Sequence, residues 1–183
     1  TSMSLACTPD LIKKLGKTNI ILDTCAIIDA SKFDEVDTFL KELMKADCTL
    51  LSLPAVKDEY TCSANSKKEY NDLSEYFDSL QIGLLNNIEK RTNDEASVAF
   101  KIALSRCKGI KPSYVDRLLL ITLYYYCETP EKVYLMTLNH KDVPLRLYDR
   151  IGFVTYDDER LHTIGIYELN MKKLKKNNTD LFK

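Results

Sequence analysis

The stretch Asn19–Asp23, with the sequence NIILD, carries the fold prediction for this chain. Its three consecutive apolar residues indicate a buried strand, and the strand ends on a carboxylate. Further short apolar runs at residues 49–53, 133–136 and 152–155 alternate with segments of helical periodicity. Because strands that alternate with helices form parallel sheets covered on both faces, we predict the α/β class with a central parallel sheet.

Helices are expected where apolar residues recur at intervals of three and four, or where capping residues precede an apolar run. The expected helices span residues 8–15, 33–46, 54–62, 65–79, 93–107, 113–127 and 141–148. Residues 81–85 are expected to form a short strand or a connection, and residues 152–155 the last strand. We expect residues 164–169 to be ordered and the lysine-rich residues 172–178 to be a solvated or frayed tail.

Composition favours one globular domain with short appendages, because 45% of the 183 residues are hydrophobic and 29% are charged. We assign residues 1–18 to an N-terminal extension with a short helix, 19–156 to the main domain and 157–183 to a C-terminal extension. The sequence lacks a membrane-spanning apolar run and a signal core, so we expect a cytoplasmic protein without a membrane partner. The six cysteines form no CxxC pair and only two histidines are present, which argues against a zinc site.

Acidic and polar residues follow the predicted strands at four places. Asp23 ends the first strand, Glu59 lies early in the helix after the second, and Asp116 lies in the first turn of the helix at 113–127. The strand at 133–136 is followed by Thr137, Asn139 and Asp142. Because sites in open α/β sheets form at the carboxyl ends of strands, we expect these side chains to meet.

Each of these residues also has a purely structural interpretation. Asp23 is suited to cap the next helix, and Glu59 to a surface position on its helix. Asp116 lies three residues after Ser113, the spacing of a capping box, while Asn139 and Asp142 are ordinary turn and cap residues. The functional prediction therefore depends on the occurrence of all four segments together and in order.

Several carboxylates at one sheet edge are suited to hold a hard divalent cation such as Mg²⁺ or Mn²⁺. Such a cation lowers the pKa of a bound water and stabilises charge on a phosphate, so no nucleophilic side chain is required. The candidate metal ligands are Asp23, Glu59, Asp116, Asn139 and Asp142.

At these residues the sequence resembles the PIN-domain family of nucleases, over roughly residues 19–156. Residues 21–25 (ILDTC) are similar to the first motif of that family, with Cys25 in place of the common Asn. Residues 56–60 (VKDEY) resemble the second motif, with Glu59 ranked above Asp58, and residues 115–117 (VDR) the third. Residues 137–142 (TLNHKD) resemble the fourth, in which either Asn139 or Asp142 is the fourth site residue.

The resemblance implies a Rossmann-like three-layer α/β/α sandwich and a divalent-metal-dependent endoribonuclease. Catalytic roles then fall to Asp23, Glu59, Asp116 and Asp142, and the expected substrate-binding residues are Thr24, Thr137, Asn139 and Arg117. RNA is the expected substrate, with Mg²⁺ or Mn²⁺ as the cofactor. Many family members are toxins of toxin–antitoxin pairs, so the expected partners also include an antitoxin or other protein and a second copy of the chain.

Two other functions stay open. The first is a catalytically degenerate PIN module that binds RNA or protein without cutting. The second is a phosphotransferase of the haloacid dehalogenase type, which requires an Asp where Cys25 stands. Local positive charge is available to bind RNA phosphates at Lys67, Lys68, Lys101, Arg106, Lys108 and Lys111, although solvated surface charge is the favoured interpretation of each one. We expect Tyr124–Tyr126 to serve core packing and His140 to be a turn residue.

Overall fold

A six-stranded sheet forms the centre of the molecule in the computed structural model, which describes residues 8–91, 93–127, 129–157 and 162–182. Its strands are β1 (Asn19–Leu22), β2 (Thr49–Ser52), β3 (Gly83–Leu84), β4 (Val133–Thr137), β5 (Tyr148–Tyr156) and β6 (His162–Leu169). They are arranged in the order β3-β2-β1-β4-β6-β5. The pairings β3–β2, β2–β1 and β1–β4 are parallel, whereas β6 is antiparallel to both of its neighbours. The sheet is therefore mostly parallel.

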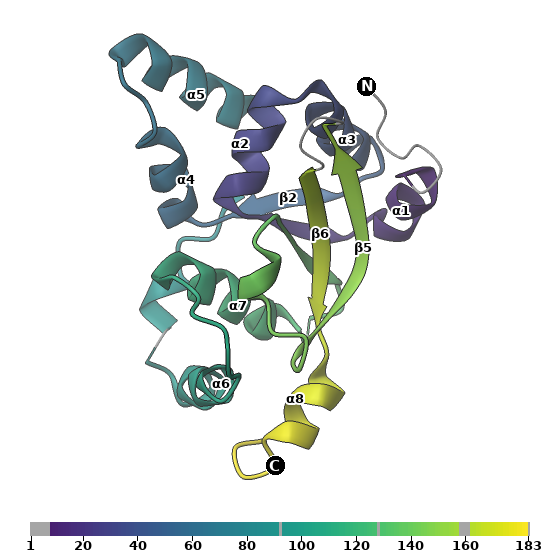
Figure 1. Ribbon diagram of the computed structural model, residues 1–183, viewed down its shortest axis with the longest axis vertical. Coiled ribbons are helices and arrows are strands. Elements are labelled where there is room, and N and C mark those ends of the chain that lie inside the picture. Colours follow the sequence, from purple (N-terminus) through teal and green to yellow (C-terminus); the bar gives the residue numbers. More distant parts are fainter. Residues whose placement is uncertain (1–7, 92, 128, 158–161, 183) are drawn as a thin grey trace.

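Helices cover both faces of this sheet (Figure 1). α2 packs against α3 and α4 on one side, and α7 packs against β4 and α6 on the other. The helices are α1 (Thr8–Leu15), α2 (Thr24–Lys32), α3 (Asp34–Lys45), α4 (Pro54–Thr61), α5 (Lys67–Ser79), α6 (Glu95–Ser105), α7 (Tyr114–Tyr126) and α8 (Met171–Asn177), with short 3₁₀ turns η1 (Glu89–Arg91) and η2 (His140–Asp142). This arrangement confirms the predicted α/β/α sandwich. In the described residues, no helix is both long and apolar enough to cross a membrane.

The central strand β1 places the first acidic residue at the carboxyl edge of the sheet. Ile20, Ile21 and Leu22 are fully buried, because β1 lies between β2 and β4 and is covered on both faces. The backbone N–H of Asp23 donates to the carbonyl of Met136 (3.1 Å), which extends the β1–β4 ladder by one residue. The ends of β1 and β4 therefore meet at Asp23.

The C-terminal third of the chain differs from the sequence prediction. Residues 152–155 are the middle of β5, which is not the last strand, since β6 follows and lies between β4 and β5. β6 comes from the stretch that the sequence assigned to a C-terminal extension. The predicted helix at 141–148 is also wrong: η2 covers three residues, and Val143, which precedes Pro144, is extended. Proline disfavours a helical conformation in the residue before it and has no N–H to continue a helix.

Two helices were not predicted. α2 has no clear apolar stripe, because its buried residues lie around much of its circumference. The predicted frayed tail at 172–178 is wrong, since these residues belong to α8 and its C-cap. Asn170 caps α8 and Leu174 is fully buried, while Lys173 forms an ion pair with Asp149 of β5 (2.5 Å). The first seven residues of the predicted N-terminal extension lie outside the described residues.

Candidate active site

Asp23 lies between the end of β1 and the start of α2, where it is the N-cap residue of α2. Its Oδ1 accepts a hydrogen bond from the backbone N–H of Thr24 (2.6 Å), and its Oδ2 accepts one from the Thr137 hydroxyl (2.7 Å). The Cys25 thiol also donates to Oδ2 (3.3 Å). The hydrogen bond from Thr24 is the expected helix-capping contact. The bonds from Thr137 and Cys25 are additional, and they fix the second carboxylate oxygen at the carboxyl edge of the sheet.

Burial shapes the protonation of this site. It raises the pKa of Asp23, and the negative charge of Asp116 raises it further, while the donors from Thr137, Cys25 and Thr24 act in the opposite direction. Burial and the neighbouring Asp23 also raise the pKa of Cys25 to about 12. Cys25 is therefore a neutral thiol at pH 7 and serves as a hydrogen-bond donor to Asp23, not as a thiolate nucleophile.

Glu59 reaches the same region from α4. Pro54 is the first residue of this helix and is separated from the end of β2 by Leu53 alone, so Glu59 lies about one and a half turns into the helix. Its Oε2 accepts a hydrogen bond from the Thr24 hydroxyl (2.6 Å). Because Thr24 follows Asp23 in the chain, this bond ties the second acidic segment to the first.

Asp116 lies in the first turn of α7 and forms a reciprocal capping box with Ser113. Its Oδ2 accepts a hydrogen bond from the backbone N–H of Ser113 (3.0 Å), and its own N–H donates to the Ser113 hydroxyl (3.1 Å). The side-chain amide of Asn139, from the segment after β4, donates to the same oxygen at 3.4 Å. The capping box and the predicted site thus use the same carboxylate.

One open cavity of about 410 Å³ is lined by all four predicted segments. It receives Asp23 and Thr24 from the end of β1, Glu59 from α4, Asp116 from α7 and Asn139 from the end of β4. The rest of its lining is Cys25, Ile28, Ser113 and Leu138. We call this space the acidic cavity. The structure therefore brings together five of the eight predicted site residues around one space.

The other three predicted residues lie outside this lining. Thr137 is buried behind Asp23, with 1% of its surface exposed. Asp142 lines only a second recess of about 10 Å³, which has room for one water at most and is also lined by Asp23, Asp116, Thr137 and Asn139. Arg117 lines a different hollow, between α6 and α7. Asn139 therefore occupies a better position for the fourth site residue than Asp142, and Arg117 does not face the acidic cavity.

The donor set has the chemistry that Mg²⁺ and Mn²⁺ prefer, because carboxylate and amide oxygens are hard ligands. Within the described residues, no three His, Cys, Asp or Glu side chains are grouped so that they could hold a metal ion. The described part of the chain therefore contains no closed three-carboxylate cage. Mg²⁺ is commonly held by one or two carboxylates, with waters and substrate phosphates as the other ligands, and the acidic cavity fits that open arrangement.

Beyond Thr24 and Thr137, the sequence did not reveal two contacts that support the segments next to Asp23. The hydroxyl of Ser52, at the end of β2, is fully buried and donates to the carbonyl of Leu22 (2.7 Å). The backbone N–H of Leu138 donates to the Cys25 sulfur (3.4 Å). A polar residue at the end of an apolar strand was the signal available for Ser52. His140 is a structural residue, since its ring nitrogens contact the Tyr167 hydroxyl (2.5 Å) and the Thr163 carbonyl (2.8 Å).

Comparison of the chain with protein-family models, with curated proteins and with solved structures gives no match. The resemblance of the four motifs to the PIN-domain family is therefore a prediction that rests on the sequence alone. The function has to be argued from the acidic cavity itself.

Proposed function

We propose that this chain is a divalent-metal-dependent endoribonuclease of the PIN type that hydrolyses RNA phosphodiester bonds at the acidic cavity. The observation that carries the proposal is the convergence of Asp23, Glu59 and Asp116, from three separate segments, on the lining of one open cavity. Burial and the nearby charge of Asp116 raise the pKa of Asp23, so the ionised pair is costly without a cation, and this favours a site that binds one.

Asp23 and Asp116 are the proposed direct ligands of Mg²⁺ or Mn²⁺, and the side-chain oxygen of Asn139 is the proposed third. When bound, the metal supplies a water of lowered pKa and stabilises charge on the phosphate. Thr137 and the Thr24 N–H hold the Asp23 carboxylate in place, and Asn139 orients Asp116. Glu59, which lines the cavity and accepts a hydrogen bond from Thr24, is the proposed residue that orients water.

The test is cleavage of a short fluorescent single-stranded RNA with Mg²⁺ or Mn²⁺, using the wild-type chain and Asp23→Asn. Asn can still cap α2, so the variant is expected to fold and to lose cleavage by a factor of about a thousand. The matched control is Asp72→Asn on α5, which removes an exposed carboxylate (61% exposed) and should cleave as the wild type does. Wild-type cleavage that persists in excess EDTA would contradict the proposal.

The second candidate is a catalytically inactive PIN module that binds RNA or protein. It is favoured by the missing three-ligand group among the described residues and by the engagement of Glu59 with Thr24. Metal-dependent cleavage by the wild type that is absent in Asp23→Asn would exclude it. RNA binding by the wild type without cleavage, in either metal, would instead support it.

A further inference from the structure

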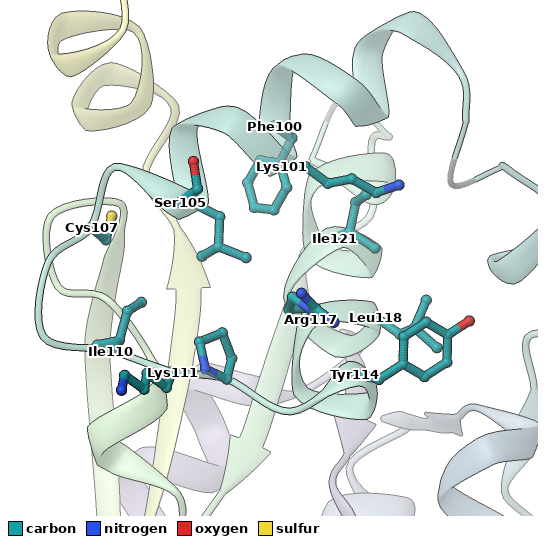
Figure 2. A pocket seen from close by; sticks show the side chains of 12 residues that line it. Phe100, Lys101, Ser105, Cys107, Ile110, Lys111, Tyr114, Arg117, Leu118 and Ile121 are labelled. Atoms are coloured by element: carbon teal, nitrogen blue, oxygen red, sulfur yellow. The ribbon is translucent and has the colours of Figure 1, made fainter.

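A cavity of about 540 Å³ lies between α6, the loop at residues 106–113 and α7 (Figure 2). Its apolar wall includes Phe100 and Leu104 of α6, Ile110 of the loop and Leu118 and Ile121 of α7. We call it the basic hollow, because its lining includes two lysines and an arginine. Its volume lies within the range of small-molecule and cofactor pockets, about 300–1,000 Å³.

Three cationic side chains, Lys101, Lys111 and Arg117, line this hollow, and no Asp or Glu is among its lining residues. They come from α6, the loop and α7, and Figure 2 shows Lys101 and Lys111 on opposite sides of the hollow, with Arg117 between them in this view. The whole chain has a formal net charge of −1, so this is a local concentration of positive charge. A concave surface that carries only positive charge favours an anionic ligand.

Tyr114 adds an exposed aromatic ring to the lining, with 56% of its surface accessible. Exposed aromatic side chains next to cations are the usual surface on which nucleobases stack, and phosphates are held by the neighbouring Lys and Arg. The hollow thus combines an apolar wall, a stacking ring and positive charges. A ligand with a flat aromatic part and a phosphate satisfies all three.

The basic hollow and the acidic cavity share a wall, the first turn of α7. Ser113 and Asp116 line the acidic cavity, whereas Tyr114 and Arg117 line the basic hollow. Successive helical residues point about 100° apart, so consecutive residues serve the two spaces from adjacent faces of one turn. A phosphate bound at Asp116 would therefore have Arg117 at the next position of the same helical turn.

We propose that the basic hollow is a nucleotide subsite for single-stranded RNA, which receives the nucleotide next to the scissile phosphate. Tyr114 stacks on its base, Arg117 contacts its phosphate, and Lys101 and Lys111 add positive charge on either side of the hollow. This inference rests on the proposed nuclease function, because the subsite would orient the RNA substrate relative to the acidic cavity. It also gives Arg117 a role in substrate binding, at a different place from the one that the sequence predicted.

The test measures binding of a short fluorescein-labelled single-stranded RNA by anisotropy in EDTA, where cleavage is absent. Arg117→Ala and Tyr114→Ala are each expected to raise Kd about tenfold. The first variant loses the phosphate contact and the second loses the stacking on the base. The matched controls are Lys14→Ala, an exposed cation on α1, and Tyr70→Ala, an exposed tyrosine on α5 (49% exposed), which should change Kd less than twofold. All four positions are exposed, so the variants are expected to fold.

Equal Kd values for the hollow variants and their controls would overturn the subsite. A second result would also overturn the subsite: a fluorescein-labelled acidic peptide binds in a way that depends on Arg117 and Tyr114, while RNA binding does not depend on them. The hollow would then be a docking site for protein. The outcome is separable from the proposed function. RNA binding that depends on Arg117 in a wild type that never cleaves would refute the nuclease and leave the subsite, whereas cleavage that is indifferent to Arg117 would refute the subsite alone.

Discussion

The acidic cavity and the basic hollow lie on adjacent faces of the first turn of α7 and are built in opposite ways. In the acidic cavity, Asp23 is buried and both of its oxygens accept hydrogen bonds, so its position is set by β1, α2 and β4. In the basic hollow, Arg117 and Tyr114 are exposed side chains on an apolar wall. Rigid, partly desolvated groups suit chemistry, whereas exposed groups suit binding of a substrate that must also leave.

The largest expected effect separates two neighbours in the chain, Asp116 and Arg117. Asp116→Asn should lower kcat about a hundredfold or more, because it removes a charge that a catalytic cation needs. Arg117→Ala should raise KM about tenfold and change kcat less than about twofold, since it removes substrate binding only. Steady-state kinetics on one RNA measures both. The comparison fails if both variants change the same parameter.

The next effect distinguishes the two candidates for the fourth site residue. Asn139→Ala should lower kcat/KM by about 10- to 100-fold, because Asn139 lines the acidic cavity and bonds Asp116. Asp142→Ala, outside that cavity, should cost about threefold or less. A larger loss for Asp142→Ala would assign the fourth position to Asp142 instead.

A stability measurement against pH probes the buried carboxylate. The pKa of Asp23 is raised from 3.8, chiefly by burial, so the folded state binds this proton more tightly than the unfolded state. The Asp23 contribution therefore favours folding most below pH 3.8 and weakens as pH rises through the folded-state pKa. Asp23→Asn should melt at a higher temperature than the wild type at pH 7, and the difference should shrink on acidification. An equal difference at all pH values would refute this account.

The smallest expected effect concerns the stability of the basic hollow. Arg117→Ala should change the free energy of unfolding by no more than about 0.5 kcal/mol, because an exposed side chain is lost. Leu118→Ala, at the next position, should cost about 2–5 kcal/mol, since Leu118 is only 2% exposed. Urea unfolding of both variants provides the comparison. A large decrease in the free energy of unfolding for Arg117→Ala would mean that Arg117 stabilises the fold and that the hollow is a structural feature.

The acidic cavity could be predicted because it follows from local patterns and one general property of parallel sheets. The run NIILD, Pro54 after β2 and the Ser113–Asp116 capping box each mark an element boundary within a few residues. Carboxyl ends of neighbouring parallel strands meet at one edge, so residues after those strands converge. Arg117 lines a different hollow from its neighbour Asp116 because adjacent residues on a helix face different directions, and the helical pattern alone does not say which direction faces the site.

The C-terminal part shows where local patterns are insufficient. The insertion of β6 between β4 and β5 depends on pairings such as Met136 with Ile166, between residues far apart in the chain. α8 has one fully buried apolar residue, Leu174, among lysines, so its amphipathic signal is weak and its docking depends on β5 through Lys173 and Asp149. Tertiary contacts outweigh propensity in both segments.

By itself, the sequence determined the α/β class, most of the strands and helices, and the set of acids that meet at the carboxyl edge, because these depend on short-range periodicity, caps and strand ends. Tertiary structure alone decided the order of the last strands, the second hollow beside α7 and the choice of Asn139 over Asp142 in the cavity lining. Those features depend on which distant segments pack together. The free energy of that packing is distributed over contacts between residues far apart in the chain, so no short window of sequence contains it.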